Sequence, residues 1–504
     1  MGQIRRQTIL SSISTYLGFL VGALNTYLFV RAGSGSFTPA EYGLTRIFTD
    51  VGQIMFAVGS FGVANMLYKF YPYYKDNLDR KDNDLLSLVL GAVTVGAVLV
   101  LVGGLIFEPF IVRKFSARSA LFVSYYHLVF PFGLGLLFFS VLESYAWTVK
   151  HSVFSTFLRE AAVRMYALLL IIPYYLNWID FDTFIKLFAF QYVTTAVTLW
   201  IYLGRRKFMH LTFRISRVTR RFKKKIIAMS GLSYGAAVIQ IVAQAFDGIL
   251  IAGLIDLKTA GIYTFLLYVA NIIQVPLRSV QAVTIPHLSQ AWKDKDIERI
   301  RRIYQRTSIN LLILSLFLFL LIWLCTLDAF AVLPIQQAYK QGLNVILLLG
   351  IARIIDGGTG VNGQIIGTST YYRFEFGTGV LLLALRIPLN YVLIKAHGIA
   401  GSAIADLISL VVYNGIRIVF LSRKFHLQPF SYKTALALLY SAAAYLLVYA
   451  CCYRLHGWAA IFSKTILFTG IYGGAVLVSR LTPDAQQVWT GLKEKATRAF
   501  GPRP

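Results

Sequence analysis

Residues 85–107, with the sequence LLSLVLGAVTVGAVLVLVGGLIF, form a continuous apolar run without a charged side chain. A helix of about 20 apolar residues crosses the hydrocarbon core of a bilayer, so this run predicts a membrane-spanning helix. Similar stretches recur along the chain, which predicts an all-α polytopic membrane protein with about 14 transmembrane helices. The expected spans lie near 9–30, 44–68, 85–107, 121–146, 153–175, 183–203, 228–254, 262–288, 308–327, 343–368, 377–395, 399–420, 434–453 and 459–479.

The composition agrees with a chain that lies mostly in lipid. Of the 504 residues, 57% are hydrophobic and only 14% are charged, whereas soluble domains carry about 25% charged residues. The three cysteines, Cys325, Cys451 and Cys452, lie in apolar runs and have no disulfide or metal-site spacing. The seven histidines are scattered. We therefore expect no metal and no cofactor, and a function carried out within or across the bilayer.

The positive charge of the chain indicates orientation rather than nucleic-acid binding. The net charge is +27, but the basic residues lie in short clusters between apolar spans, whereas a nucleic-acid-binding protein concentrates them on a folded polar surface. With the N-terminus inside, the inner segments carry roughly four times as many Lys and Arg as the outer loops. This bias predicts that both termini are cytoplasmic.

The basic stretch 205–227 separates two sets of six expected spans. We predict an N-lobe at 1–204, a cytoplasmic linker at 205–227 that also touches anionic membrane lipids, and a C-lobe at 228–420. A specific regulatory site is the alternative interpretation of the linker. Two further helices are expected within 421–480, followed by a cytoplasmic tail at 481–504.

An internal duplication relates the two lobes. Thr38-Pro39-Ala40-Glu41-Tyr42-Gly43 precedes the second span, and Leu257-Lys258-Thr259-Ala260-Gly261 precedes the eighth, so that a shift of 218 positions superposes Gly43 on Gly261. An even number of spans in each lobe gives both lobes the same polarity in the membrane. That arrangement predicts a pseudo-symmetric pair of lobes with substrate at their interface.

Several short motifs carry a family resemblance. They are Phe37–Gly43, Asp247–Gly253, Gly261–Tyr263, Ala338-Tyr339, and Asn390 with Gly398–Ala405. The pattern resembles the multidrug/oligosaccharidyl-lipid/polysaccharide (MOP) exporter superfamily, and within it the Wzx-type, O-antigen-like polysaccharide flippases of bacteria.

This resemblance implies two six-helix lobes around a central cavity, plus two C-terminal helices, working by alternating access. The implied cargo is an undecaprenyl-diphosphate-linked oligosaccharide, moved to the outer leaflet of the bacterial inner membrane for polysaccharide or lipopolysaccharide biosynthesis. Polysaccharide polymerase and glycosyltransferases are the implied protein partners.

Arginines within the expected spans are candidate contacts for the cargo. A charged side chain in the membrane is costly and therefore a functional candidate, and the guanidinium fork binds phosphate oxygens bidentately. The candidates for binding the diphosphate are Arg46, Arg278, Arg353 and Arg386. The alternative interpretation is that Arg46–Asp50 and Arg353–Asp356 are internal ion pairs that only let helices pack.

Two carboxylates are candidates for ion coupling, because a buried Asp that exchanges H⁺ or Na⁺ can drive transport. Asp247 is the first candidate and Asp50 the second, although Asp247 also fits a cap or a salt bridge. Asn362 and Gln364 are candidate contacts to sugar hydroxyls, in a glycine-rich stretch that fits close helix packing equally well.

Three rival functions remain open. A lipid II flippase would also need cationic side chains for its cargo. A MATE-type drug or cation antiporter would use carboxylates rather than arginines. A membrane glycosyltransferase or polymerase is suggested only by Asp180-Phe181-Asp182, which lies in an expected outer loop where nucleotide sugars are absent. We therefore predict a transporter that is not an enzyme.

Overall fold

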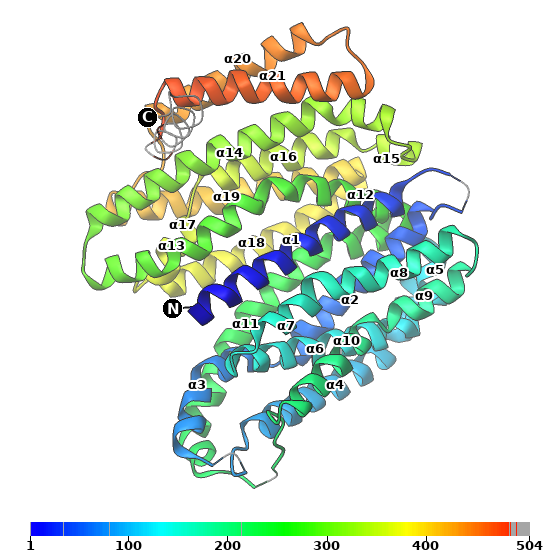
Figure 1. The fold of residues 1–504 in the computed structure, drawn as a ribbon, viewed down its shortest axis with the longest axis vertical. Coiled ribbons are helices and arrows are strands. Elements are labelled where there is room, and N and C mark those ends of the chain that lie inside the picture. Colours follow the sequence, from blue (N-terminus) through cyan, green and yellow to red (C-terminus); the bar gives the residue numbers. More distant parts are fainter. Residues whose placement is uncertain are drawn as a thin grey trace, which may run out of the picture. The chain divides into compact units, whose positions relative to one another are not determined.

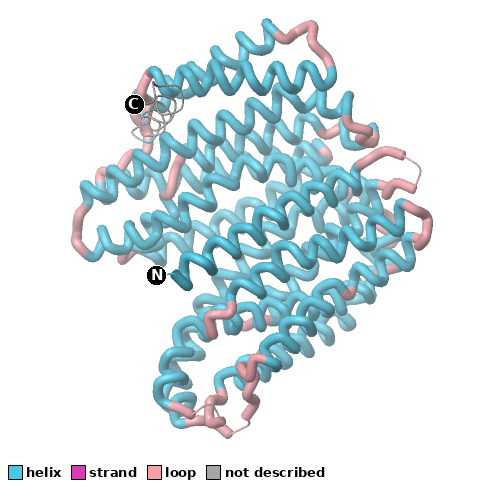
Figure 2. The backbone as a smooth tube through the Cα atoms, viewed as in Figure 1, coloured by secondary structure: helices cyan, strands magenta, loops and turns pink. Residues whose placement is uncertain are grey.

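The protein was studied as a computed structural model, which describes residues 2–33, 35–79, 81–212, 214–482, 484 and 490. Within these ranges the chain is helical and holds no β-strand (Figures 1 and 2). The predicted all-α fold class is therefore confirmed. The contacts divide the chain into two compact units, Met1–Thr264 and Phe265–Pro504.

In the first unit, α6 forms the centre. Its span is 78% buried and packs against α2, α3, α4 and α10. The helices of this unit are α1 (Gly2–Val30), α2 (Pro39–Gly59), α3 (Val63–Asn77), α4 (Leu85–Phe115), α5 (Ala120–Ser124), α6 (Val129–Thr148), α7 (Ser152–Phe157), α8 (Val163–Tyr175), α9 (Phe181–Ala189), α10 (Gln191–Arg205), α11 (Arg217–Leu254) and the start of α12 (Leu257–Asn271).

In the second unit, α14 packs against α16, α20 and α21, and α19 packs against α16 and α18 (Figure 1). Leu316 and Leu324 of α14 share one apolar cluster with Phe468 and Tyr472 of α21, so the last two helices belong to this unit. The remaining helices are α13 (Val275–Lys293), α14 (Ile297–Val332), α15 (Gln337–Lys340), α16 (Leu343–Gly358), α17 (Asn362–Thr368), α18 (Tyr372–His397), α19 (Ile399–Phe425), α20 (Tyr432–Cys451) and α21 (Gly457–Val478).

The described residues contain ten helices, or up to eleven when the bent pair α16 and α17 counts as one span, that are long and apolar enough to cross a membrane. The chain is therefore a multi-pass membrane protein. Of the fourteen expected spans, those at 44–68, 153–175 and 228–254 are also helical but fall outside that set. The first of them is broken at Phe61 and Gly62, which have positive φ angles of 46° and 67° and separate α2 from α3.

The division after Thr264 lies later in the chain than the predicted linker at 205–227. The physical reason is visible at Asp84, whose Oδ2 accepts hydrogen bonds from the backbone N–H of Ser216 at 2.9 Å and from the hydroxyl of Thr219 at 2.7 Å. Asp84 is 4% exposed and holds the start of α11 to the first unit. Most of the predicted tail, 481–504, lies outside the described residues.

The glycines that suggested a duplication contact each other within the first unit. Helix α2 begins at Pro39 and α12 at Leu257, the same shift that relates Gly43 to Gly261. A Cβ on Gly43 would lie 2.3 Å from the carbonyl oxygen of Leu257, and one on Gly261 would lie 2.2 Å from that of Pro39. The two helices therefore cross through a reciprocal contact, as a duplicated pair would.

Gly43→Ala is expected to destabilise the protein, because the added methyl group would meet backbone atoms that cannot move without shifting α12. Overpacking of this kind costs about 1–3 kcal/mol. The matched control is Gly91→Ala in α4, where a Cβ meets nothing within 4 Å. Thermal unfolding in detergent should show a lower midpoint for Gly43→Ala only, and equal midpoints would contradict the crossing.

Candidate functional site

A polar cluster in the first unit is built on α2, α11 and α12. Arg46 and Asp50 lie one helical turn apart on α2. The guanidinium carbon of Arg46 lies 4.9 Å from the centre of the Tyr42 ring, and its Nε is buried without a hydrogen-bond partner. Among the described residues, Arg46 has no ion pair within 4.0 Å. The suggested Arg46–Asp50 salt bridge is therefore not formed.

The two candidate coupling carboxylates belong to the same cluster. Asp50 lies against α11, where a Cβ on Gly248 would be 2.5 Å from its Oδ2. The neighbouring Asp247 is 1% exposed and accepts a hydrogen bond from the Tyr263 hydroxyl at 3.4 Å. Asp50 interacts electrostatically with Arg46 and, to a smaller extent, with Asp247. Because the two carboxylates repel each other, a proton or a cation bound beside them would stabilise the cluster.

In the second unit, one carboxylate holds two of the candidate arginines. Asp406 on α19 is fully buried. Its Oδ2 lies 3.2 Å from Nη2 of Arg353 on α16, and its Oδ1 lies 3.0 Å from Nη2 of Arg386 on α18. We refer to these three residues as the Asp406 clamp. The clamp joins three helices through charges that are removed from solvent.

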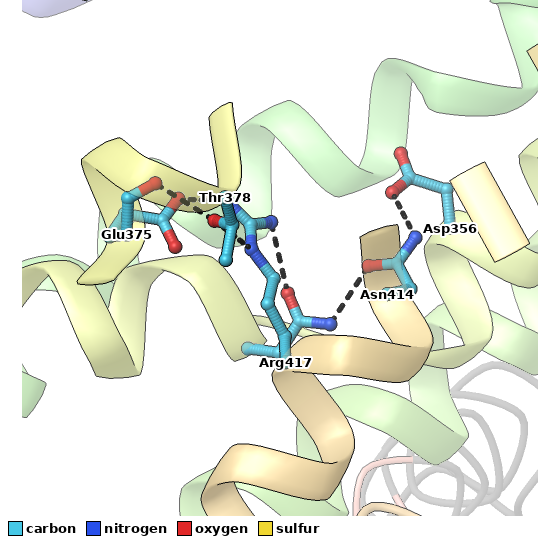
Figure 3. Close-up of polar contacts among 6 residues, drawn as sticks. Asp356, Glu375, Thr378, Asn414 and Arg417 are labelled. Atoms are coloured by element: carbon cyan, nitrogen blue, oxygen red, sulfur yellow. Dashed lines mark hydrogen bonds and ion pairs between the residues drawn. The ribbon is translucent and has the colours of Figure 1, made fainter. Parts of the chain in front are cut away.

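A second buried network extends from Asp356 on α16 (Figure 3). The amide of Gln274 donates to one carboxylate oxygen of Asp356 at 3.2 Å, and the amide of Asn414 on α19 donates to the other at 3.3 Å. Asn414 in turn accepts a hydrogen bond of 2.9 Å from Asn362. Asn362, a candidate glycan contact, therefore uses its amide inside the protein.

The same network ends at an arginine that the sequence analysis did not single out. Arg417 on α19 forms an ion pair with Glu375 on α18 and donates to Thr378 and to Asn362, both at 3.4 Å (Figure 3). Its guanidinium carbon lies 3.6 Å from the centre of the Tyr413 ring. The spacing of Asn414 and Arg417, three residues apart within an apolar helix, was a signal for a shared polar face.

The last two candidates have few contacts. Arg278 on α13 is exposed, and with the residues that the structure describes it makes neither a hydrogen bond nor an ion pair. Gln364 on α17 is half-buried. Its backbone carbonyl accepts a hydrogen bond from Thr368 at 2.7 Å, which leaves its side-chain amide available.

The Asp180-Phe181-Asp182 motif has a structural explanation. Asp180 caps the start of α9, where its carboxylate accepts the backbone N–H of Thr183 at 3.0 Å. Hydrogen bonds from Thr183 hold the pKa of Asp180 below its usual value. Asp182 lies 2.5 Å from the ammonium of Lys186. Asp180 therefore serves the local helix, whereas Asp182 also accepts a hydrogen bond from the Tyr125 hydroxyl at 3.2 Å.

No protein-family model matches the sequence, and no curated protein matches it. Solved structures do match. The lipid II flippase MurJ, in an inward closed conformation, has a TM-score of 0.73 and 13% identity, and the match covers 94% of this chain and 99% of that one.

Two other transporters match over shorter parts of the chain. An inward-facing multidrug resistance MATE family transporter of the MOP superfamily has a TM-score of 0.59 and 13% identity, covering 81% of this chain and 94% of that one. A MOP superfamily transporter from Pyrococcus furiosus, described as having a binding pocket of reverse polarity, has a TM-score of 0.51 and 13% identity, with 83% and 95% covered. The chain therefore has the fold of MOP-superfamily transporters, the fold that it shares with the lipid II flippase MurJ.

Proposed function

We propose that this protein is a non-enzymatic flippase that moves an undecaprenyl-diphosphate-linked oligosaccharide from the cytoplasmic to the periplasmic leaflet of the bacterial inner membrane. Both termini lie in the cytoplasm, and the process is alternating access for cell-surface polysaccharide or lipopolysaccharide biosynthesis. The single observation that carries this proposal is Arg46, a half-buried guanidinium in α2 that forms no ion pair within 4.0 Å among the described residues and whose Nε has no hydrogen-bond partner.

An arginine in the centre of a bilayer costs about 2.5–3.5 kcal/mol or more. In the second unit, Asp406 offsets this cost for Arg353 and Arg386. Arg46 interacts electrostatically with Asp50 but forms no ion pair within 4.0 Å in the described chain, and Arg278 has no acidic partner there. A diphosphate that approaches either arginine would supply negative charge, and a guanidinium can bind its oxygens bidentately.

Arg353 and Arg386 take a second role in this proposal. Their charges are answered while the Asp406 clamp is closed, so they reach the cargo only when α16, α18 and α19 move apart. In this scheme Arg353 and Arg386 bind the cargo at one stage of transport and pair with Asp406 at another. Gln364 is the stronger of the two proposed glycan contacts, since the amide of Asn362 already bonds to Asn414.

Ion coupling is proposed for Asp247 and Asp50. With Arg46 these two carboxylates make a cluster of net charge −1, so one H⁺ or Na⁺ neutralises it. In this scheme the cation binds the carboxylates and the phosphate binds Arg46.

Two observations favour other transported molecules. The structural match to the lipid II flippase covers 94% of the chain. Transport of lipid II would also require cationic side chains along the path. The pair Asp50 and Asp247 would suit the cationic cargo of a MATE-type antiporter. The arginines without acidic partners favour the anionic cargo over the cationic one.

Purified protein in proteoliposomes should distinguish these substrates. We expect it to move a fluorescent undecaprenyl-diphosphate oligosaccharide between leaflets, detected by loss of fluorescence when a reductant is added outside. A cationic dye in the same vesicles should show no movement. Transport of the dye, with the lipid-linked glycan remaining in its leaflet, would contradict the proposal, and a preference for lipid II would assign the alternative cargo.

A further inference from the structure

The surface of the second unit contains a groove between α18 and α19 that the flippase proposal does not use. Its volume is about 640 Å³, within the range of ligand sites. The groove is lined by Phe374, Val412, Gly415, Ile416, Val419, Phe420, Arg423 and Lys424. Most of these side chains are apolar, and the two basic ones follow each other near the end of α19.

The floor of the groove is rigid and apolar. Phe374 of α18 and Phe420 of α19 stack with their ring centres 4.0 Å apart and their planes inclined by 17°. Val412, Ile416 and Val419 recur every three or four residues and therefore share one face of α19. At Gly415 between them, a Cβ would meet no atom within 4 Å. The missing side chain keeps the middle of the groove open.

The basic end of the groove is free to bind an anion. Arg423 and Lys424 lie in the last turn of α19, and both are exposed. In the described part of the chain, Arg423 has no acidic partner, and the ammonium of Lys424 lies 5.5 Å from the Tyr371 ring. The distribution of Lys and Arg along the sequence assigns this end to the cytoplasmic side, where anionic headgroups attract basic residues.

We propose that the groove binds an anionic phospholipid of the surrounding bilayer, with an acyl chain along the apolar floor and the phosphate between Arg423 and Lys424. Acyl chains are apolar wherever they lie in the membrane, so the floor gives shape but little affinity. Selectivity therefore comes from charge. A zwitterionic lipid would bring its own cation against the two basic side chains, and a second copy of this chain would bring another basic pair.

Native mass spectrometry of the purified full-length chain tests this site. The probes are phosphatidylglycerol and phosphatidylcholine with identical acyl chains. We expect the wild-type protein to bind phosphatidylglycerol more tightly. The double variant Arg423→Gln/Lys424→Gln should lose about thirtyfold in affinity, since each basic residue near an anionic headgroup contributes about 1 kcal/mol. Gly415→Leu, whose Cβ would meet no atom within 4 Å, adds a side chain to the floor and should also weaken binding.

Matched controls separate the groove from general effects. Gly470→Leu on α21 adds the same side chain at another exposed glycine whose Cβ meets nothing within 4 Å. Lys293→Gln/Arg302→Gln removes two exposed charges from the same predicted membrane face. Both controls should bind phosphatidylglycerol like the wild type.

Three results would overturn the assignment. The first is equal affinity for the two lipids, and the second is unchanged affinity in either groove variant. The third is occupancy by something else: tighter binding of undecaprenyl phosphate than of phosphatidylglycerol, or a dimer that Gly415→Leu converts to a monomer in light scattering. Each of these leaves the flippase proposal standing, since Arg46 and Arg278 lie outside the groove.

Discussion

Arg46→Gln is expected to lower the rate of flipping by about 30- to 100-fold in proteoliposomes. The guanidinium forms no ion pair within 4.0 Å in the described chain, so in this account its main ligand is the diphosphate of the cargo, and a charge-assisted bidentate contact is worth about 2–3 kcal/mol. Arg46→Lys should give an intermediate rate, because it keeps the charge and loses the planar fork.

The control for this prediction is Arg113→Gln, which removes one exposed charge at the end of α4. It should flip like the wild type. Arg46→Gln also removes the cation beside Asp50, so the thermal midpoint should be measured for each variant and the flipping rates compared on folded, monodisperse protein. A wild-type flipping rate in Arg46→Gln would remove the residue from the cargo path.

The second large effect is expected at the Asp406 clamp. Asp406→Asn removes the carboxylate that lies against the guanidinium groups of both Arg353 and Arg386. Breaking a buried ion pair in this way costs about 3–5 kcal/mol. We expect a thermal midpoint lower by roughly 5 °C or more and a smaller yield of monodisperse protein. Adding Arg386→Gln should recover part of the loss, because it removes one of the two cations that Asp406 contacts.

An exposed ion pair provides the comparison for the clamp. Asp182→Asn breaks the contact with Lys186, in which the two side chains are 44% and 58% exposed. Solvent screening limits such pairs to less than about 1 kcal/mol, so this variant should unfold near the wild-type midpoint. Equal midpoints for Asp406→Asn and Asp182→Asn would show that the clamp contributes no more than a surface pair.

The fold could be predicted from sequence because membrane insertion is a local property. A window of about 20 residues such as 85–107 is apolar enough to be recognised alone, and the structure places α4 there. The matching positions of Gly43 in α2 and Gly261 in α12 were likewise visible as a repeat within the sequence, but the contact between the two glycines is known only from the structure. The expected span at 44–68 carries Arg46 and Asp50 and is broken at Phe61 and Gly62.

The partners of the buried charges could not be predicted in the same way. Neighbours in sequence suggested Arg353 with Asp356, but Arg353 pairs with Asp406, a residue 53 positions away on another helix. Tertiary packing decides which helices lie side by side, and the hydropathy of the sequence does not reveal that packing. The same is true of Arg417, whose partner Glu375 precedes the expected span at 377–395 and lies inside α18.

The most direct test of the account is the affinity of the purified protein for undecaprenyl diphosphate without a glycan. The wild-type protein and the double variant Arg46→Gln/Arg278→Gln should be titrated at one fixed salt concentration. We predict that the double variant binds at least about 30-fold more weakly, while Arg113→Gln binds like the wild type. Equal affinity in all three proteins would contradict the central claim that arginines without acidic partners hold the diphosphate of the cargo.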